Sequence, residues 1–178
     1  MNQERTNKFV GRLMALYRSD NRAALAKLRR AAPRLPLSTG EVLAVVGDQM
    51  AGLNDAEIAD LSLVAALFAL HPHENGHGSF GLSFRRVWLH PKSNGSDSTK
   101  RRFEVLCDAD RERLPTHLYG AISLARARGV SVNWFQLATD IPNWSSSDRS
   151  VQLRWLKDFF VPPKQSEYSE QKEILDVP

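Results

Sequence analysis

The sequence predicts an all-α fold, built as two small helical lobes that form one compact protein with a basic face. Apolar residues recur every three or four positions along most of the chain, the spacing that places them on one face of a helix. Capping residues, glycines and prolines separate these runs, as they do where helices begin and end. No segment alternates apolar and polar residues as a half-buried strand does, and no internal repeat is present.

The 178 residues, 42% hydrophobic and 25% charged, have the composition of an ordinary globular protein. A chain of this length buries about two-thirds of its unfolded surface, so it can hold a core without disulfides. Cys107 is the single cysteine, so no disulfide can form within the chain. The start shows no signal-peptide pattern, and no apolar run approaches the ~18 residues of a membrane span. We therefore expect a cytoplasmic protein with no membrane partner.

The first lobe is expected over residues 1–75, as four helices. An apolar stripe predicts the first helix over about residues 7–18, and Asp20 or Asn21 can cap the second. The prolines at positions 33 and 36 end the second helix, because proline cannot donate the backbone hydrogen bond that a helix interior needs.

Two further helix starts in this lobe have the spacing of a capping box. Ser38 precedes Glu41 by three positions, as Asn54 precedes Glu57, and this spacing lets each side chain bond the other residue's free backbone amide. A strongly apolar run follows the second start and continues to Leu70. We expect this pair of helices to pack on the first two.

A connecting region is expected over residues 76–99, with a loop, a short helix over 82–89 and a linker over 91–99 that is rich in Pro, Gly, Asn and Ser. The second lobe then spans residues 100–162. The last residues, 163–178, are polar and acidic and have little apolar periodicity, so we expect a mobile tail.

The second lobe is predicted to hold four short helices, the first beginning at Lys100. Pro115 fits the first turn of the next helix, which Gly129 ends. Asn133 can cap a helix over 134–141. The last helix has two candidate caps, Ser146 and Ser147.

Charge is divided unevenly along the chain. Residues 1–34 carry nine Lys and Arg against two acids, whereas residues 35–84 carry six acids and no Lys or Arg. Residues 85–162 carry thirteen basic against eight acidic residues, and the remainder carries two basic against four acidic. Interspersed signs would serve solubility better, so this segregation indicates two kinds of partner surface. The alternative is charge drift along solvated helix faces.

One glycine-rich string suggests a dinucleotide site but has a better structural explanation. Gly76, Gly78 and Gly81 fit the pattern G-x-G-x-x-G, which functions only between a strand and a helix. Here the string follows a helix, and Asp97, the candidate acidic partner, lies in the expected linker. We therefore predict a structural loop and no cofactor.

The candidate metal and nucleophile groups are also weak. His71, His73 and His77 share a loop that lacks Cys or carboxylate partners at ligand spacing. Cys107 lies on an apolar stripe, which indicates a buried thiol and not a nucleophile paired with His117. We expect no metal and no catalytic residue. The remaining candidates are predicted to be turn carboxylates or core aromatics: Asp108, Asp110, Trp134, Trp144 and Trp155.

Arginines and one lysine on the polar faces of the helices are the predicted functional residues. A guanidinium presents planar donors that match phosphate oxygens, and each contact that displaces counterions from a nucleic acid adds affinity. Without a base-reading motif, such helices are expected to follow the backbone. The predicted nucleic-acid-binding residues are Arg29, Arg30, Lys100, Arg101, Arg102, Arg126, Arg128, Arg149 and Arg154.

Several segments, taken in order, resemble one known family. They are Leu28-Arg-Arg-Ala-Ala-Pro33, Ser79-Phe-Gly-Leu-Ser-Phe-Arg-Arg86, Lys100-Arg-Arg-Phe-Glu-Val-Leu106, Leu124 to Trp134, Asn143-Trp144 and Arg149 to Phe160. This order, over most of residues 8–160, resembles the CasB small subunit of the type I-E CRISPR Cascade complex.

The resemblance implies an all-helical, two-lobed protein without catalytic activity. It implies a second copy of itself and the other Cascade subunits as partners, together with the guide RNA, the target double-stranded DNA and its displaced single strand. Basic positions of the family match Arg29 with Arg30, Arg101, Arg102, Arg126 and the Arg149–Arg154 segment. The family's role is to stabilise the guide–target heteroduplex and the displaced strand of the R-loop.

Two other functions are considered beside this one. A protein-binding adaptor would use the acidic helices of residues 35–84 to dock a basic partner. A nuclease would need a carboxylate cluster suited to a metal, and the sequence shows none.

Overall fold

Nine α-helices and two short 3-10 helices form the described part of the computed structural model, which covers residues 2–32, 39–74 and 76–161. The same residues contain no strand, so the predicted all-α class is confirmed. The elements are α1 (Gln3–Arg18), α2 (Arg22–Ala31), α3 (Thr39–Val46), η1 (Gly47–Met50), α4 (Asp55–Leu70), α5 (Phe80–Leu89), α6 (Asp97–Asp108), α7 (Leu114–Ala127), α8 (Trp134–Asp140), η2 (Ile141–Asn143) and α9 (Ser150–Phe160).

Three of the predicted helix caps are confirmed. The Asn21 side chain accepts a hydrogen bond from the backbone N–H of Ala24 at 3.1 Å. Asn54 and Glu57 form the reciprocal capping box, with bonds of 3.0 and 3.1 Å. Asn133 caps α8 in the same way as Asn21 caps α2. The cap predicted at Ser38 and the acidic tail lie outside the described residues.

Four helices begin at other positions than predicted. Asn2 caps α1, which therefore starts at Gln3, and Ser79 caps α5, which starts at Phe80. Helix α6 starts at Asp97, inside the expected linker and before Lys100. An acidic residue in the first turn faces the positive end of the helix dipole, which favours this earlier start. The fourth is α9.

The prediction that Ser146 or Ser147 caps this last helix is wrong. Helix α9 starts at Ser150 and follows Arg149, whose backbone is left-handed with φ 50°. The Asp148 carboxylate accepts a hydrogen bond of 3.1 Å from the backbone N–H of Ser150. Asp148 therefore satisfies a free backbone N–H at the start of α9, as a serine cap was expected to do.

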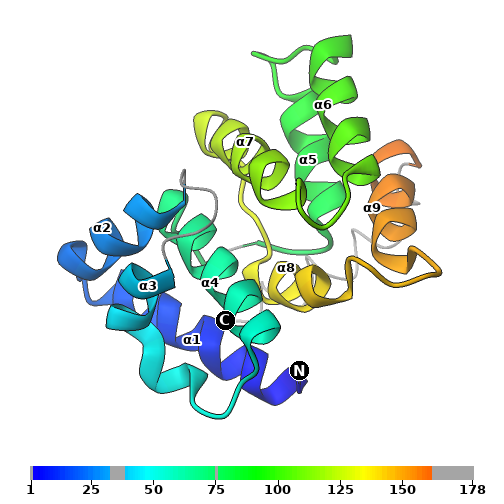
Figure 1. Cartoon of the computed structure of the whole chain (residues 1–178). Helices are drawn as coiled ribbons and strands as arrows, with labels where there is room; N and C mark the ends of the chain where they lie inside the picture. The colour runs from blue at the N-terminus through cyan, green and yellow to red at the C-terminus, as the bar shows by residue number, and fades with distance from the viewer. Residues whose placement is uncertain (1, 33–38, 75, 162–178) are drawn as a thin grey trace, which may run out of the picture.

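Helix α4 lies at the centre of the fold, and every residue from Asp60 to Leu70 is buried. Helices α1, α2, α3, α7 and α8 all pack against it, as Figure 1 shows. A helix that is apolar on all sides needs such surroundings. Because α4 contacts helices on both sides of the expected boundary, the division into lobes stays a prediction.

Helices α5, α6 and α9 pack together around stacked aromatic rings, in the upper right of Figure 1. The ring of Phe103 lies 4.4 Å from that of Phe159 and 5.2 Å from that of Phe84, centroid to centroid. Gly81 permits the close approach of α5 to α9, since a Cβ at this position would lie 2.1 Å from the Trp155 carbonyl oxygen. The three tryptophans predicted to be core residues, Trp134, Trp144 and Trp155, are buried.

Among the described helices, none combines the length and the apolar character needed to cross a membrane.

Candidate nucleic-acid interface

The first turns of α6 carry three of the predicted cations side by side. Arg101 and Arg102 are exposed, and neither guanidinium has a carboxylate partner among the described residues. Lys100 is partly engaged: its Nζ lies 3.9 Å from Glu104 and 5.5 Å from the ring centroid of Phe160. The exposed ion pair contributes little energy, so all three cations remain available to an anion.

A groove of about 500 Å³ runs between α6 and α7 beside these arginines. Polar groups line part of the groove, and apolar side chains line the rest. Its lining residues are Phe84, Ser98, Arg101, Arg102, Val105, Thr116, His117, Gly120, Ala121 and Leu124. Gly120 leaves it open, because an added Cβ there would meet no atom within 4 Å.

The α7 side of this groove was missed by sequence reasoning. Thr116, His117 and Gly120 follow one another at helical spacing on α7, so a shared face could have been inferred. The sequence carried no signal that this face of α7 lies against the arginine face of α6.

A second group of cations lies at the C-terminal end of α4. Arg29, on α2, donates from Nε to the carbonyl oxygen of Ala69 at 2.9 Å. Burial lowers the pKa of His71, the residue that follows α4, and the hydrogen bond to the Val130 carbonyl acts in the opposite direction. The positive charge of Arg126, on α7, lowers this pKa further. Arg29 thus contacts the C-terminal end of α4, where carbonyl groups favour positive charge, and the charge of Arg126 acts on the residue that follows it.

Arg30 and Arg128 are engaged within the chain. Arg30 Nε lies 3.8 Å from a Glu41 carboxylate oxygen, and the arginine side chain is 56% exposed. Arg128, the C-cap residue after α7, donates from Nε to Ser93 Oγ at 3.1 Å and from Nη2 to the Lys92 carbonyl at 3.4 Å. Arg128 thus ties the end of α7 to the turn that precedes α6.

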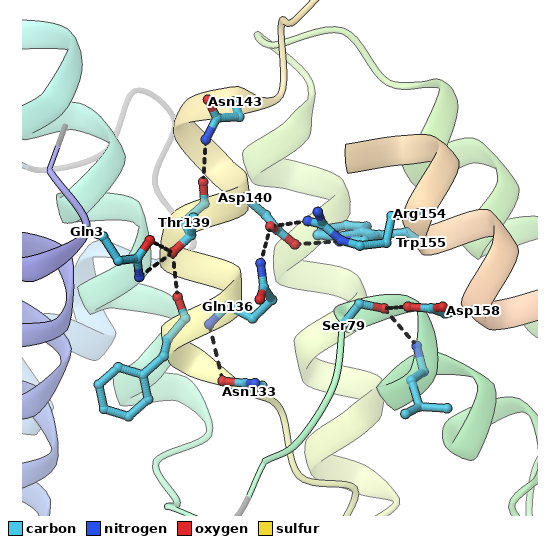
Figure 2. A network of polar contacts seen from close by, with 12 residues as sticks. Gln3, Ser79, Asn133, Gln136, Thr139, Asp140, Asn143, Arg154, Trp155 and Asp158 are labelled. Carbon is cyan, nitrogen blue, oxygen red and sulfur yellow. Dashed lines mark hydrogen bonds and ion pairs between the residues drawn. The ribbon is translucent and has the colours of Figure 1, made fainter. Parts of the chain in front are cut away.

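Arg154 forms an ion pair with Asp140, a carboxylate that is 1% exposed. The same carboxylate accepts hydrogen bonds from Gln136 Nε2 at 2.8 Å and Trp155 Nε1 at 2.7 Å. Figure 2 shows Asp140 on α8 between these donors, with Arg154 and Trp155 both reaching it from α9. The geometry gives Arg154 a structural partner, which the sequence did not reveal.

Arg149 lies at the other end of α6 from the arginine pair. Its Nη2 donates to the Cys107 carbonyl at 2.9 Å and lies 3.5 Å from Asp108. Both acceptors belong to the last turn of α6, where free carbonyl groups attract a cation. Arg149 therefore closes this helix end, and its side chain is still 54% exposed.

Two of the three histidines predicted to share the 71–77 loop, His71 and His73, use a ring nitrogen to bond the backbone. His71 Nε2 donates to the Val130 carbonyl, and His73 Nε2 accepts from the Val132 N–H, both at 2.9 Å. The glycine string is structural too: a Cβ at Gly76 would lie 2.1 Å from the backbone of Val132. Over the ranges that the structure describes, no group of three or more His, Cys, Asp or Glu is placed to hold a metal.

Three of the six carboxylates of the acidic segment, residues 35–84, form ion pairs with arginines in the described part of the chain. Asp60 is buried and forms an ion pair with Arg111, which also donates to the Ile141 carbonyl at 2.6 Å. Glu74 pairs with Arg18 at 2.7 Å, in addition to the Glu41 pair with Arg30. These three pairs reduce the negative charge that the segment can offer to a basic partner.

The sequence matches the profile of the CRISPR-associated protein Cse2 over residues 24–160. The chain belongs to the Cse2 family. A Cse2 protein of Thermus thermophilus is 33% identical to this Cse2-family chain over 112 residues, which are 63% of this chain and 62% of that protein. The aligned part thus spans less than two-thirds of the relative.

Solved structures agree with this assignment. A Cse2-family protein from T. thermophilus superposes with a TM-score of 0.74 at 28% identity, covering 87% of this chain and 97% of that one. M. ruber CasB gives 0.69 at 22% identity, and a chain of a CRISPR RNA-guided surveillance complex gives 0.73 at 21%, each covering 97% of this chain and 98% of the other. At these lower identities the likeness concerns the fold. The resemblance to the CasB small subunit is confirmed.

Proposed function

We propose that this Cse2-family chain is a small subunit of an RNA-guided CRISPR Cascade complex, where it binds nucleic acid without catalysing a reaction. Its partners are the other Cascade subunits, a second copy of itself, the guide RNA and the target DNA with its displaced strand. The family assignment and the fold support the assembly, and the relatives named as surveillance-complex chains share that fold.

The observation that carries the binding role is the pair of exposed guanidiniums of Arg101 and Arg102, which have no carboxylate partner among the described residues. An unpaired guanidinium is free to make bidentate contacts to phosphate oxygens. Arg126, exposed on α7, extends the same capacity toward the end of α4.

Modest contacts suffice for the proposed role. Opening a target duplex against a guide RNA is a nearly balanced exchange, so a few phosphate contacts to the displaced strand or the heteroduplex shift it toward the open state. Assembly into a complex supplies a high local concentration, so each subunit needs only weak affinity of its own.

The test replaces Arg101, Arg102 and Arg126 together with Gln in the assembled complex. We expect normal assembly, a shorter R-loop lifetime, and a plot of log affinity against log salt that is less steep by about 2, since each lost phosphate contact removes ~0.7–0.9. The charge-matched control replaces Lys8, Arg12 and Arg22, which are exposed on α1 and at the start of α2.

An R-loop lifetime that is unchanged in the first triple variant, or shortened equally in the control, contradicts the proposal. The first result would mean that these guanidiniums contact no nucleic acid. The second would mean that only net charge matters.

A further inference from the structure

We infer that the acidic C-terminal segment of this same chain, residues 162–178, docks in the groove between α6 and α7 and covers Arg101 and Arg102. The inference concerns an intramolecular contact and holds whether or not the groove binds nucleic acid. It rests on where the described chain ends, on charge and on the character of the groove.

The described chain ends against α6, the helix that forms one side of the groove. Phe160, in the last turn of α9, lies under the Lys100 ammonium at 5.5 Å from the ring centroid, and Lys100 immediately precedes Arg101. Helix α9 packs on both α5 and α6. The following 17 residues could span at most about 56 Å when fully extended, whereas α6 is only about 18 Å long. The segment can therefore reach every part of the groove.

The charges of the segment and the groove are opposite. Residues 162–178 carry four acids, Glu167, Glu170, Glu173 and Asp176, against Lys164 and Lys172. The groove contributes Arg101 and Arg102 and no carboxylate. Two guanidiniums without acidic partners among the described residues thus lie on α6, the helix that the last turn of α9 contacts.

The groove and the segment also both contain apolar residues. Phe84, Val105, Ala121 and Leu124 line the groove, and Val105 is 42% exposed, so part of this apolar lining is open to solvent. Near its end the segment contains both acids and apolar residues: Glu173, Ile174, Leu175, Asp176 and Val177. A groove of about 500 Å³ has the size at which pockets enclose a ligand of a few side chains.

Docking of the acidic segment would block the surface around Arg101. A docked acidic segment supplies carboxylates where a nucleic acid would supply phosphates, so the two compete for the same guanidiniums.

The test is a disulfide cross-link in the full-length chain. Gly120→Cys places a thiol in the groove without a steric conflict, and Ser169→Cys places one among the acids of the segment. Cys107 does not interfere, because it is fully buried. Oxidation in a glutathione buffer followed by mass spectrometry measures the intramolecular disulfide.

Two comparisons separate docking from chance encounter. In the first comparison, the cysteine is placed at position 11 (Gly11→Cys) and position 120 keeps its glycine. Gly11 is an equally open helical glycine on α1, which lies at the far end of the molecule from α6 (Figure 1). In the second comparison, the acids of the segment are neutralised by changing Glu167, Glu170 and Glu173 to Gln and Asp176 to Asn. The chain length and the cysteines at positions 120 and 169 stay the same.

We expect the cross-link at Gly120 to exceed that at Gly11 and to fall about fivefold when the segment is neutral, the size of effect that two exposed ion pairs produce. A yield at Gly120 that is unchanged by neutralising the segment overturns the inference. Addition of single-stranded DNA then reports separately on function: if docking is supported but the DNA does not reduce the cross-link, the proposed nucleic-acid role of the groove fails and the docking stands.

Discussion

The buried carboxylate of Asp140 accepts a hydrogen bond of 2.7 Å from the indole Nε1 of Trp155, which joins the end of α8 to the middle of α9. Arg154, the neighbouring residue, pairs with the same carboxylate from a position nearer to solvent. One acid thus satisfies an indole in the core and a guanidinium at the surface (Figure 2). A buried polar group of this kind is costly to leave without partners.

Replacing Asp140 with Ala is therefore expected to lower the free energy of unfolding by about 3–5 kcal/mol, because Trp155 and Arg154 both lose their acceptor. Urea unfolding measures the change. Glu112→Ala, at an exposed loop acid, is the control and is expected to alter stability by no more than about 0.5 kcal/mol. Equal stability of the two variants would show that the network contributes nothing to the fold.

Gly81 and Gly120 are both helical glycines, and alanine is expected to act on them in opposite directions. At Gly81 a Cβ would meet the backbone of Trp155 at 2.1 Å, so α5 and α9 must separate and stability falls by about 1–3 kcal/mol. At Gly120 nothing lies within 4 Å, so Ala is expected to raise stability by about 0.5–1 kcal/mol through better helix propensity. Thermal unfolding of the two variants tests the difference in sign.

His73 is expected to make stability depend on pH below neutrality. Burial, and then the nearby His71, lower the pKa of His73 to about 4 from a usual value of 6.5, and its Nε2 accepts the Val132 N–H only when the ring is neutral. The unfolded chain takes up the proton first as pH falls, so stability is full above pH 6.5 and is lost between 6.5 and about 4.

The expected loss over this window is about 1–2 kcal/mol, less than the full linkage because the ring is only half-buried. Denaturant unfolding at pH 7.5, 5.5 and 4.5 measures it. His73→Gln retains an acceptor for Val132 but does not titrate, so its stability should change less over the same range. A wild-type profile as flat as that of the variant would exclude this origin.

Cys107 is expected to be unreactive in the folded protein. Its side chain is fully buried, and burial, together with the neighbouring Asp108, raises the pKa of the thiol to about 12. Because the thiolate is the reactive form, an aromatic disulfide reagent at pH 8 should label Cys107 only in denaturant. Rapid labelling of the native chain would contradict the burial described for α6.

The arginines show where sequence reasoning reached its limit. Arg101 and Arg154 look alike in the sequence, since both are basic residues on the polar faces of helices. Yet Arg101 is exposed and has no acidic partner in the described part of the chain, whereas Arg154 pairs with a buried carboxylate. That partner, Asp140, lies on another helix, and no local sequence pattern indicates a contact between side chains on separate helices.

The sequence by itself determined the helical class, the positions of Asn21, Asn54 and Asn133 as helix starts, and the family. These features depend on local periodicity, on hydrogen bonds between residues three positions apart, and on the order of motifs. The tertiary structure alone decided which of the described cations are paired within the chain, and that α6 and α7 leave a groove beside Arg101. Those outcomes depend on how separate helices pack, because packing brings side chains distant in the sequence within reach of one another.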